Sequence, residues 1–264
     1  SASISQVYKA TLKTGEKVAV KVQRPNVKKL METDIEIMFY IANLLEKHTE
    51  HIKRFRPLKI VNEFKEWTEK ELDFRIEARN AKRFYQNFRG SKTVYIPKVY
   101  DEFTTEKVLT LEYINGIELH NIKEIKKRNL DFGRIIKNSF DAFMTQVFVH
   151  GVFHADPHPG NIIIRPDNSI GFVDFGIVGY FDEKLKNKCI DLLYGILQQN
   201  EELVVETLIS MGIENDVDYE TVKSEISAVL QQLQGSKIKE IKVSRVLEDV
   251  LEIAMKYNFR LPAS

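Results

Sequence analysis

Residues 152–176, VFHADPHPGNIIIRPDNSIGFVDFG, constrain the fold of this chain more than any other stretch. Two β-prone runs, NIII and IGFV, flank a Pro-Asp-Asn turn and predict a β-hairpin. Asn161 opens the first run, and Asp174 follows the second. An amide oxygen and a carboxylate on facing strands form an oxygen site suited to Mg²⁺, which completes its shell with phosphate and water. Asp156, in the preceding loop, is placed to accept a proton or orient a nucleophile.

His154 and His158 give the same loop the look of a metal-binding cluster, so a zinc or iron hydrolase is an alternative. The spacing disfavours it, because both histidines would have to come from one tight loop that contains two prolines. The remaining histidines, His48, His51, His120 and His150, contain no second HxH or HxxxH pair to complete a site. We interpret His154 as a core histidine bonded to backbone.

The composition is that of an ordinary globular chain. Its 264 residues, 43% of them hydrophobic, suffice for one large domain or two lobes. The chain has 39 Lys and Arg residues and 38 Asp and Glu residues, so its net charge is close to zero. This balance gives no reason to expect a nucleic-acid partner. The single cysteine, Cys189, excludes an intrachain disulfide and fits a reducing compartment. No apolar run reaches the roughly 18 to 20 residues that span a bilayer, so we expect a cytoplasmic chain, and its start at Ser1 suggests a piece of a longer protein.

The periodicity of apolar residues predicts the elements. Alternation on both sides of KTGEK predicts a hairpin over residues 3–23. Helical spacing then runs to about His48 and resumes at Pro57, with a break near Lys70. Two strands in 94–103 and 107–114 are expected to pair as a second hairpin. Helices are predicted near 131–150, 182–198, 201–211, 219–233 and 243–257.

These elements predict an α+β fold of two lobes with a cleft between them. The small, strand-rich lobe is residues 1–114, with a helical insertion at about 26–70, and the mainly helical lobe is residues 115–264. Lys21 lies near the end of the run VAVKV, where an ammonium group could project into the cleft and meet a phosphate. A strand lysine taken alone is more often a solvated surface residue.

The loop HADPHPGN followed by VDFG resembles the catalytic loop H-x-D-x-x-x-x-N and the metal motif D-F-G of protein-kinase-like enzymes. The strand VAVKV upstream strengthens the match. SASISQV and KELDFRIEARNA are similar, more narrowly, to the UbiB family of atypical kinases, the aarF-domain (ADCK-type) group linked to coenzyme Q and other prenyl-lipid metabolism. The resemblance covers nearly the whole chain. It implies a two-lobed protein-kinase-like fold with ATP and Mg²⁺ as cofactors.

The resemblance assigns roles to single residues. Lys21 matches the lysine that holds the α- and β-phosphates, and Glu77 matches the glutamate that pairs with it; the sequence alone could not select Glu77 among its neighbouring glutamates. Asp156 matches the catalytic aspartate. Asn161 and Asp174 match the two magnesium ligands.

Three further segments match parts of a nucleotide site. Glu71 and Asp73 correspond to the E-x-D motif of the family. Glu112 and Ile114 lie in LEYI, which matches the hinge that binds adenine through backbone groups. The loop that covers the phosphates would include Ala2, Ser3 and Ser5.

The chain departs from ordinary protein kinases in two places. ASISQV replaces the glycine-rich loop, and Ser5 stands where the family has glycine or alanine, so the backbone approaches phosphate less freely. No A-P-E sequence follows Asp174. A platform for protein substrates is therefore expected to be missing, and ATP hydrolysis or transfer to a small or lipid-linked acceptor is favoured.

Two alternatives stay open: a small-molecule phosphotransferase of the aminoglycoside or choline kinase type, and a nucleotide-binding pseudokinase scaffold. The expected partners are a nucleotide and, further, a prenyl lipid or lipid headgroup. The basic segments 51–56 and 123–129 are interpreted as solvated helix faces rather than lipid sites. The resemblance suggests peripheral membrane association of a longer parent protein.

Overall fold

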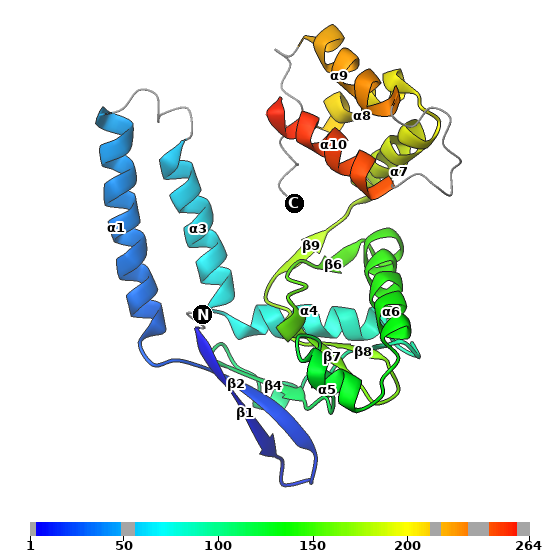
Figure 1. Cartoon of the computed structure of the whole chain (residues 1–264). Helices are drawn as coiled ribbons and strands as arrows, with labels where there is room; N and C mark the ends of the chain where they lie inside the picture. Colours follow the sequence, from blue (N-terminus) through cyan, green and yellow to red (C-terminus); the bar gives the residue numbers. More distant parts are fainter. Residues whose placement is uncertain (1–3, 49–55, 212–217, 232–242, 258–264) are drawn as a thin grey trace. The chain divides into compact units, whose positions relative to one another are not determined.

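The computed structural model describes residues 4–48, 56–211, 218–231 and 243–257 and groups the chain into two compact units (Figure 1). The first unit is Ser1–Met144 with His154–Val178, and the second is Thr145–Phe153 with Gly179–Ser264. The predicted lobe boundary at residues 114 and 115 is not tested by this grouping and stays a prediction.

The first sheet of the first unit has the strand order β1-β2-β4 and is antiparallel throughout. Its strands are β1 (Ser5–Thr11), β2 (Lys17–Gln23) and β4 (Val108–Glu112). The predicted hairpin is β1–β2, and Gly15 adopts a φ of +94° in its turn, a conformation that glycine reaches without a steric penalty. Lys21 lies on the central strand, opposite Val7 on one side and Leu109 on the other.

Two long helices, α1 (Val27–His48) and α3 (Pro57–Glu71), pack side by side after β2 (Figure 1). A further helix, α4 (Phe74–Asn87), follows α3 after a break at Leu72 and Asp73. The break occurs because Asp73 has extended backbone and its carboxylate accepts a hydrogen bond from the Arg75 N–H, which caps the new helix. The break predicted near Lys70 is confirmed.

The second sheet carries the hairpin of residues 152–176. Its strand order is β3-β8-β7-β5, with β3 (Val94–Tyr95), β8 (Ile170–Phe172), β7 (Ile162–Ile164) and β5 (Ile117–Glu118). Strands β7 and β8 are antiparallel, with Ile162 opposite Phe172. In the turn, Asp167 accepts hydrogen bonds from the Ser169 N–H and hydroxyl. The predicted hairpin is confirmed.

The hairpin predicted from segments 94–103 and 107–114 is wrong. Strand β3 pairs in parallel with β8 and β4 pairs with β2. Within the described residues, the β-pairing between the two segments is limited to the isolated antiparallel bridge Val99–Leu111, with backbone hydrogen bonds from the Tyr100 N–H to the Thr110 carbonyl and from the Glu112 N–H to the Lys98 carbonyl. Pro97 has no N–H to donate, which interrupts a regular ladder. A 3-10 helix, Asp101–Phe103, then replaces the expected strand end.

The remainder of the first unit is α5 (Ile122–Lys127) and α6 (Phe132–Met144). A 3-10 turn, Pro159–Asn161, precedes β7. In the basic segment 123–129, Glu124 pairs with Lys127 and Arg128, as expected for a solvated helix face. The other basic segment, 51–56, lies outside the described residues except for Arg56.

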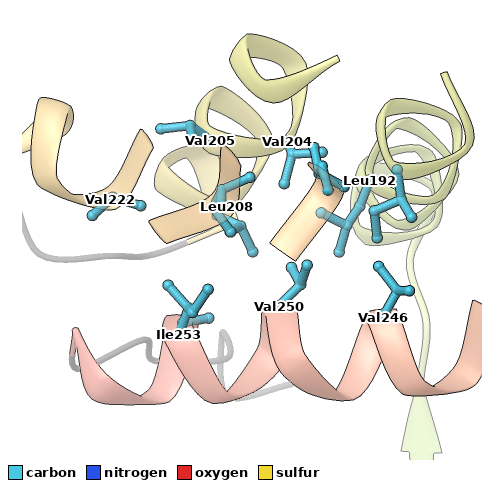
Figure 2. Close-up of a cluster of buried hydrophobic side chains, with 12 residues drawn as sticks. Leu192, Val204, Val205, Leu208, Val222, Val246, Val250 and Ile253 are labelled. Atoms are coloured by element: carbon cyan, nitrogen blue, oxygen red, sulfur yellow. The ribbon is translucent and has the colours of Figure 1, made fainter. Parts of the chain in front are cut away.

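The second unit begins with a π-helical turn, Thr145–His150. The chain passes between the units within β6 (Val152–His154) and β9 (Val178–Tyr180), which form a two-stranded sheet. Four helices follow at the predicted places: α7 (Glu183–Leu197), α8 (Glu201–Met211), α9 (Tyr219–Gln231) and α10 (Val243–Lys256). They share a cluster of buried apolar side chains (Figure 2). No described helix is both long enough and apolar enough to cross a membrane.

Replacing Leu208 tests this cluster, because its side chain is fully buried among the helices. Leu208→Ala should lower the free energy of unfolding by about 2–5 kcal/mol through lost burial and a residual cavity. Leu197→Ala is the matched control, since the Leu197 side chain is 37% exposed and should cost much less. Urea unfolding gives both values, and equal losses would contradict the packing described.

Candidate functional site

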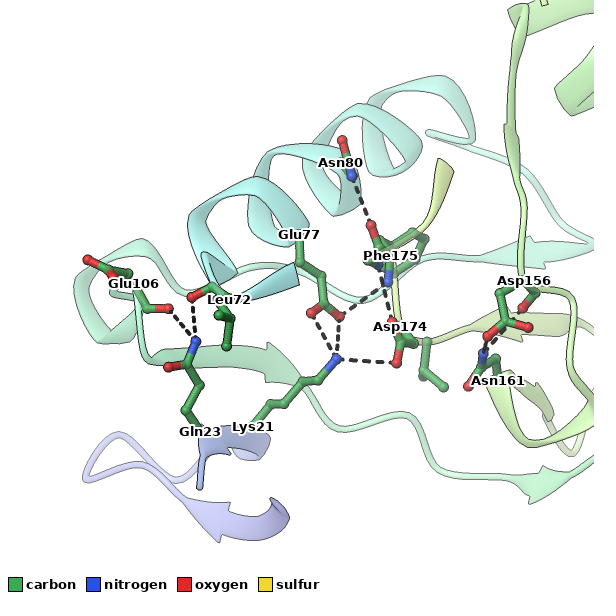
Figure 3. A network of polar contacts seen from close by, with 12 residues as sticks. Lys21, Gln23, Leu72, Glu77, Asn80, Glu106, Asp156, Asn161, Asp174 and Phe175 are labelled. Carbon is green, nitrogen blue, oxygen red and sulfur yellow. Dashed lines mark hydrogen bonds and ion pairs between the residues drawn. The ribbon is translucent and has the colours of Figure 1, made fainter. Parts of the chain in front are cut away.

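Lys21 is the centre of a polar network in the first unit (Figure 3). Its Nζ donates to Glu77 Oε2 at 2.9 Å and to Glu77 Oε1 at 3.1 Å. The same Nζ donates to Asp174 Oδ2 at 3.2 Å. These three side chains are far apart in the sequence but meet in the fold. Lys21 comes from strand β2, Glu77 from helix α4 and Asp174 from the segment that follows β8.

Burial and the neighbouring charges decide the ionisation of these groups. Burial alone would lower the pKa of Lys21, but the carboxylates of Glu77 and Asp174 raise it overall, so the ammonium form is favoured. Burial would raise the pKa of Asp174, yet Lys21 lowers it overall. Burial raises the pKa of Glu77 to about 7, against the opposing effect of Lys21. The network therefore contains a fixed cation and a fixed anion, with one carboxyl that titrates near neutrality.

The bend at Asp174-Phe175-Gly176 is held by several contacts. Asp174 has a φ of +67°, a left-handed conformation that costs a non-glycine residue about 1–2 kcal/mol. Its Oδ1 accepts from the Gly176 N–H at 3.1 Å, and the Phe175 N–H donates to Glu77 Oε1 at 3.2 Å. The Phe175 ring is fully buried, 5.3 Å from the Phe84 ring by centroid distance. These contacts compensate for the strain and fix the Asp174 carboxylate.

The side chains of the two loop histidines contact neighbouring rings and backbone N–H groups. His154 is buried within ring contacts to Phe84, Phe172 and Phe175, and its Nδ1 accepts from the Asp156 N–H at 3.3 Å. His158 Nδ1 accepts from the Gly160 N–H at 3.1 Å. In the part of the chain that the structure describes, no group of three or more His, Cys, Asp or Glu side chains is arranged to hold a metal ion. The interpretation of His154 as a core histidine agrees with these contacts.

Asp156 and Asn161 lie together. Asn161 Nδ2 donates to Asp156 Oδ2 at 2.9 Å and to the Asp156 backbone carbonyl at 3.2 Å (Figure 3). The Val173 N–H donates to the Asn161 carbonyl, so the residue before Asp174 is tied to Asn161. Since its amide nitrogen is used, Asn161 can offer its side-chain oxygen. With the Asp174 carboxylate, the oxygen donors fit a hard cation that needs few protein ligands, such as Mg²⁺.

The side chains of Glu71 and Asp73 have different surroundings, although only one residue separates them in the sequence. A methyl group built on Gly176 would lie 2.9 Å from Glu71 Oε1 and 3.2 Å from Asp174 Oδ1, so both carboxylates flank this glycine. Burial raises the pKa of Glu71, and Asp174 adds to the effect. Asp73 instead caps α4, and its carboxylate receives two hydrogen bonds of 2.8 Å from the Arg75 side chain. Glu71 joins the network and Asp73 does not.

The predicted hinge and loop residues are placed as follows. Glu112 ends β4; its N–H donates to the Lys98 carbonyl, and its carboxylate accepts from the Tyr95 hydroxyl. Ile114 is buried, and no hydrogen bond at its backbone N–H is found within the described residues. Ser5 is buried at the start of β1, opposite Gln23. Ala2 and Ser3 lie outside the described residues.

A known protein family matches the part of the chain that contains this network. The family described as the ABC1 atypical kinase-like domain matches residues 1–208, which include every polar residue of the network. The chain belongs to this family. The predicted resemblance to UbiB-type atypical kinases is confirmed, and with it the assignment to a kinase-like family of ATP-binding type.

Relatives of this ABC1 domain match along its entire length. It is 34% identical to Protein ACTIVITY OF BC1 COMPLEX KINASE 7, chloroplastic, of Arabidopsis thaliana over 100% of this chain and 38% of that protein. It is 32% identical to the Probable protein kinase UbiB of Aliivibrio fischeri over 99% of this chain and 49% of that protein. The chain thus spans about half or less of the length of these curated relatives.

A solved structure shares the fold. The Rv3197 protein of Mycobacterium tuberculosis, determined in complex with erythromycin, matches with a TM-score of 0.65 and 24% identity over 98% of this chain and 72% of that one. At this identity the likeness concerns the fold alone. Together with the family match, it confirms the predicted α+β, two-lobed kinase-like fold.

Sequence reasoning missed two polar residues of the ABC1 domain. Gln23 donates through Nε2 to the backbone carbonyl of Leu72 at 2.5 Å and of Glu106 at 3.3 Å, which ties the α3–α4 junction to β2. Asn80 donates to the backbone carbonyl of Phe175. Asn80 could have been noted, since it follows Glu77 by three residues and so shares its helix face. No sequence signal marks Gln23, whose partners are backbone atoms brought close by folding.

The pKa of Glu77 predicts a pH dependence of stability. The unfolded carboxyl titrates near 4.5 and the folded one at about 7, so between these values the native chain keeps a proton that the unfolded chain has lost. The contribution of Glu77 to stability is therefore full below about pH 4.5 and is lost as the pH rises through 7. Urea unfolding of wild type and Glu77→Gln between pH 5 and 8 should show wild type declining relative to the variant. A difference that does not change with pH would contradict the shift.

Proposed function

We propose that this chain is the ATP-binding, magnesium-dependent catalytic domain of a UbiB-type atypical kinase or ATPase. The observation that supports this most directly is the contact of Lys21 with both Glu77 and Asp174. A lysine held between two carboxylates keeps its charge and its position, and a nucleotide phosphate could then replace one of its contacts. Family membership independently favours the same role for Lys21.

Asn161 and Asp174 are the residues proposed to hold Mg²⁺. The ion, when bound, would neutralise and orient the terminal phosphates of ATP. Asp174 is suited to this because its carboxylate stays ionised, and its Oδ1 and Oδ2 are both oriented by donors. Glu71 adds a second carboxylate beside Gly176 and is proposed to act on the nucleotide-metal complex.

Asp156 is the proposed catalytic aspartate. Its carboxylate is oriented by the Asn161 amide at 2.9 Å, and its backbone N–H is bonded to the buried His154. A carboxylate oriented by one amide, on a backbone that is itself fixed, can accept a proton from an attacking hydroxyl or orient water without first reorganising. Glu112 and Ile114 are proposed to bind the adenine through their backbone groups, and the backbone N–H of Ile114 is suited to donate to it.

The acceptor is proposed to be water or a small, prenyl-lipid-like hydroxyl compound of coenzyme Q-type metabolism rather than a protein. The absence of an A-P-E segment after Asp174 supports a non-protein acceptor. The UbiB name of one relative, itself described as a probable protein kinase, supports only the link to coenzyme Q-type metabolism. Two alternatives remain. The catalytic loop is also compatible with a phosphotransferase that uses a soluble acceptor. The glycine-free phosphate loop is also compatible with a nucleotide-binding scaffold.

Phosphate release from Mg-ATP distinguishes these functions. We expect slow release by the chain alone and faster release with vesicles that contain anionic lipid or with a prenylated phenol. Rapid phosphorylation of an amino-sugar or amino-alcohol in an acceptor screen would favour the phosphotransferase. Tight nucleotide binding with no release under any condition would favour the scaffold.

A further inference from the structure

Asn80 and Glu77 lie on the same face of α4, and both side chains hydrogen-bond to the backbone of Phe175. Asn80 Nδ2 donates to the Phe175 carbonyl at 2.9 Å, and Glu77 Oε1 accepts from the Phe175 N–H at 3.2 Å (Figure 3). Residues three apart on a helix are neighbours on its surface, so the two side chains act as a pair. Both backbone groups of Phe175 are thereby tied to α4.

The contact made by Asn80 is tertiary, like that of Asn138 with the Asn168 carbonyl, and differs from those of the exposed helical asparagines Asn43 and Asn62. Asn43 and Asn62 donate to the carbonyls of Phe39 and Leu58, four residues earlier in their own helices, and both bonds are exposed. Such bonds are local and arise without any tertiary fold. Asn80 instead reaches a carbonyl 95 residues away, and its bond is part-buried.

The Phe175 carbonyl depends on this donor. Within the described residues no other hydrogen bond to that carbonyl is found, and the Phe175 side chain is fully buried. A carbonyl that loses its donor away from water is destabilised, so the bend would rotate to seek another partner. Because Asp174 precedes Phe175 in a strained left-handed conformation, such a rotation would also turn its carboxylate.

We propose that Asn80 is a positioning residue that holds the Asp174 carboxylate in its metal-binding orientation by fixing the Phe175 peptide. The proposal deepens, and rests on, the magnesium-dependent nucleotide binding proposed above. Asn80 itself touches neither metal nor nucleotide in this account. Asn80 connects helix α4, which carries Glu77, to the segment that carries Asp174. The positions of the two carboxylates that contact Lys21 therefore depend on each other.

The first test uses the nucleotide-free chain and needs no activity. Amide hydrogen exchange over residues 174–177 should be about five- to tenfold faster in Asn80→Ala than in wild type, because one hydrogen bond that closes the bend is lost. Asn80→Asp keeps the shape but cannot donate when ionised, and should exchange at least as fast. Asn138→Ala removes a comparable part-buried bond elsewhere, from Asn138 to the Asn168 carbonyl, and should match wild type over residues 174–177. Unchanged exchange in both Asn80 variants would overturn the proposal.

The second test separates positioning from general loss of structure. Calorimetry should show that Asn80→Ala needs about five- to tenfold more Mg²⁺ for half-maximal ATP binding, with nucleotide affinity in the absence of metal within twofold of wild type. Equal weakening with and without metal would overturn the positioning role. If wild type itself fails to bind Mg-ATP, the proposed function fails, whereas the exchange result on the bend still decides whether Asn80 holds it.

Discussion

Asp174→Asn should abolish most of the magnesium dependence of ATP binding while leaving the chain folded. The variant keeps the size of the side chain but removes the charge that Mg²⁺ requires. We expect the Mg²⁺ concentration for half-maximal binding to rise by at least the roughly 10- to 100-fold that follows loss of a ligand-supporting partner. Asparagine retains an oxygen that can accept from Lys21, so the lysine keeps a neutral partner in place of an anion.

The matched control for this variant is Asp101→Asn, because Asp101 is also paired with a lysine, Lys82, but its side chain is 67% exposed and belongs to no part of the site. Isothermal calorimetry of both variants, with ATP and a series of Mg²⁺ concentrations, makes the comparison. Unchanged Mg-ATP affinity in Asp174→Asn would show that the metal assignment is wrong.

Asp156→Asn should lower turnover and spare binding. If Asp156 acts on the attacking hydroxyl or water, its loss should reduce the rate of phosphate release by about 10²- to 10⁴-fold. The Asn161 amide can still donate to the oxygen of an asparagine at this place, so the loop should keep its geometry. The dissociation constant for Mg-ATP should stay within about twofold of wild type.

Asp141→Asn serves as the control for turnover, since Asp141 is an exposed residue of α6 paired with Lys137. Single-turnover measurement of phosphate release separates the chemical step from product release. A variant at Asp156 that releases phosphate as fast as wild type would remove this residue from the mechanism. Parallel losses of binding and rate would instead indicate damage to the loop.

The hairpin of residues 152–176 was predictable because its signals are local. Two short β-prone runs and a Pro-Asp-Asn turn act within a few residues, and the structure has β7, β8 and the expected turn. The end of α3 was predictable to within a few residues for the same reason, since Asp73 is a strong helix cap. The helices of the second unit followed from their apolar periodicity.

Features that depend on tertiary partners could not be derived in this way. Strand β3 pairs with β8, 75 residues or more downstream, rather than with its neighbour in sequence, and nothing local specifies that choice. Glu77 is distinguished from nearby glutamates only because α4 presents it to Lys21, so its assignment came from resemblance. Glu71 and Asp73 share a motif, yet a helix ends between them and directs them to different surroundings.

Thermal stabilisation by nucleotides shows whether Lys21, Asp174, Asn161 and Asp156 form a working site for magnesium and ATP. A ligand that binds only the native state raises its stability by RT ln(1 + [L]/Kd), about 2.7 kcal/mol at a hundredfold excess over Kd. We predict a clear rise in the melting temperature with ATP or ADP when Mg²⁺ is present, and a smaller rise with the nucleotide alone. No rise with either nucleotide, with or without Mg²⁺, would contradict the account.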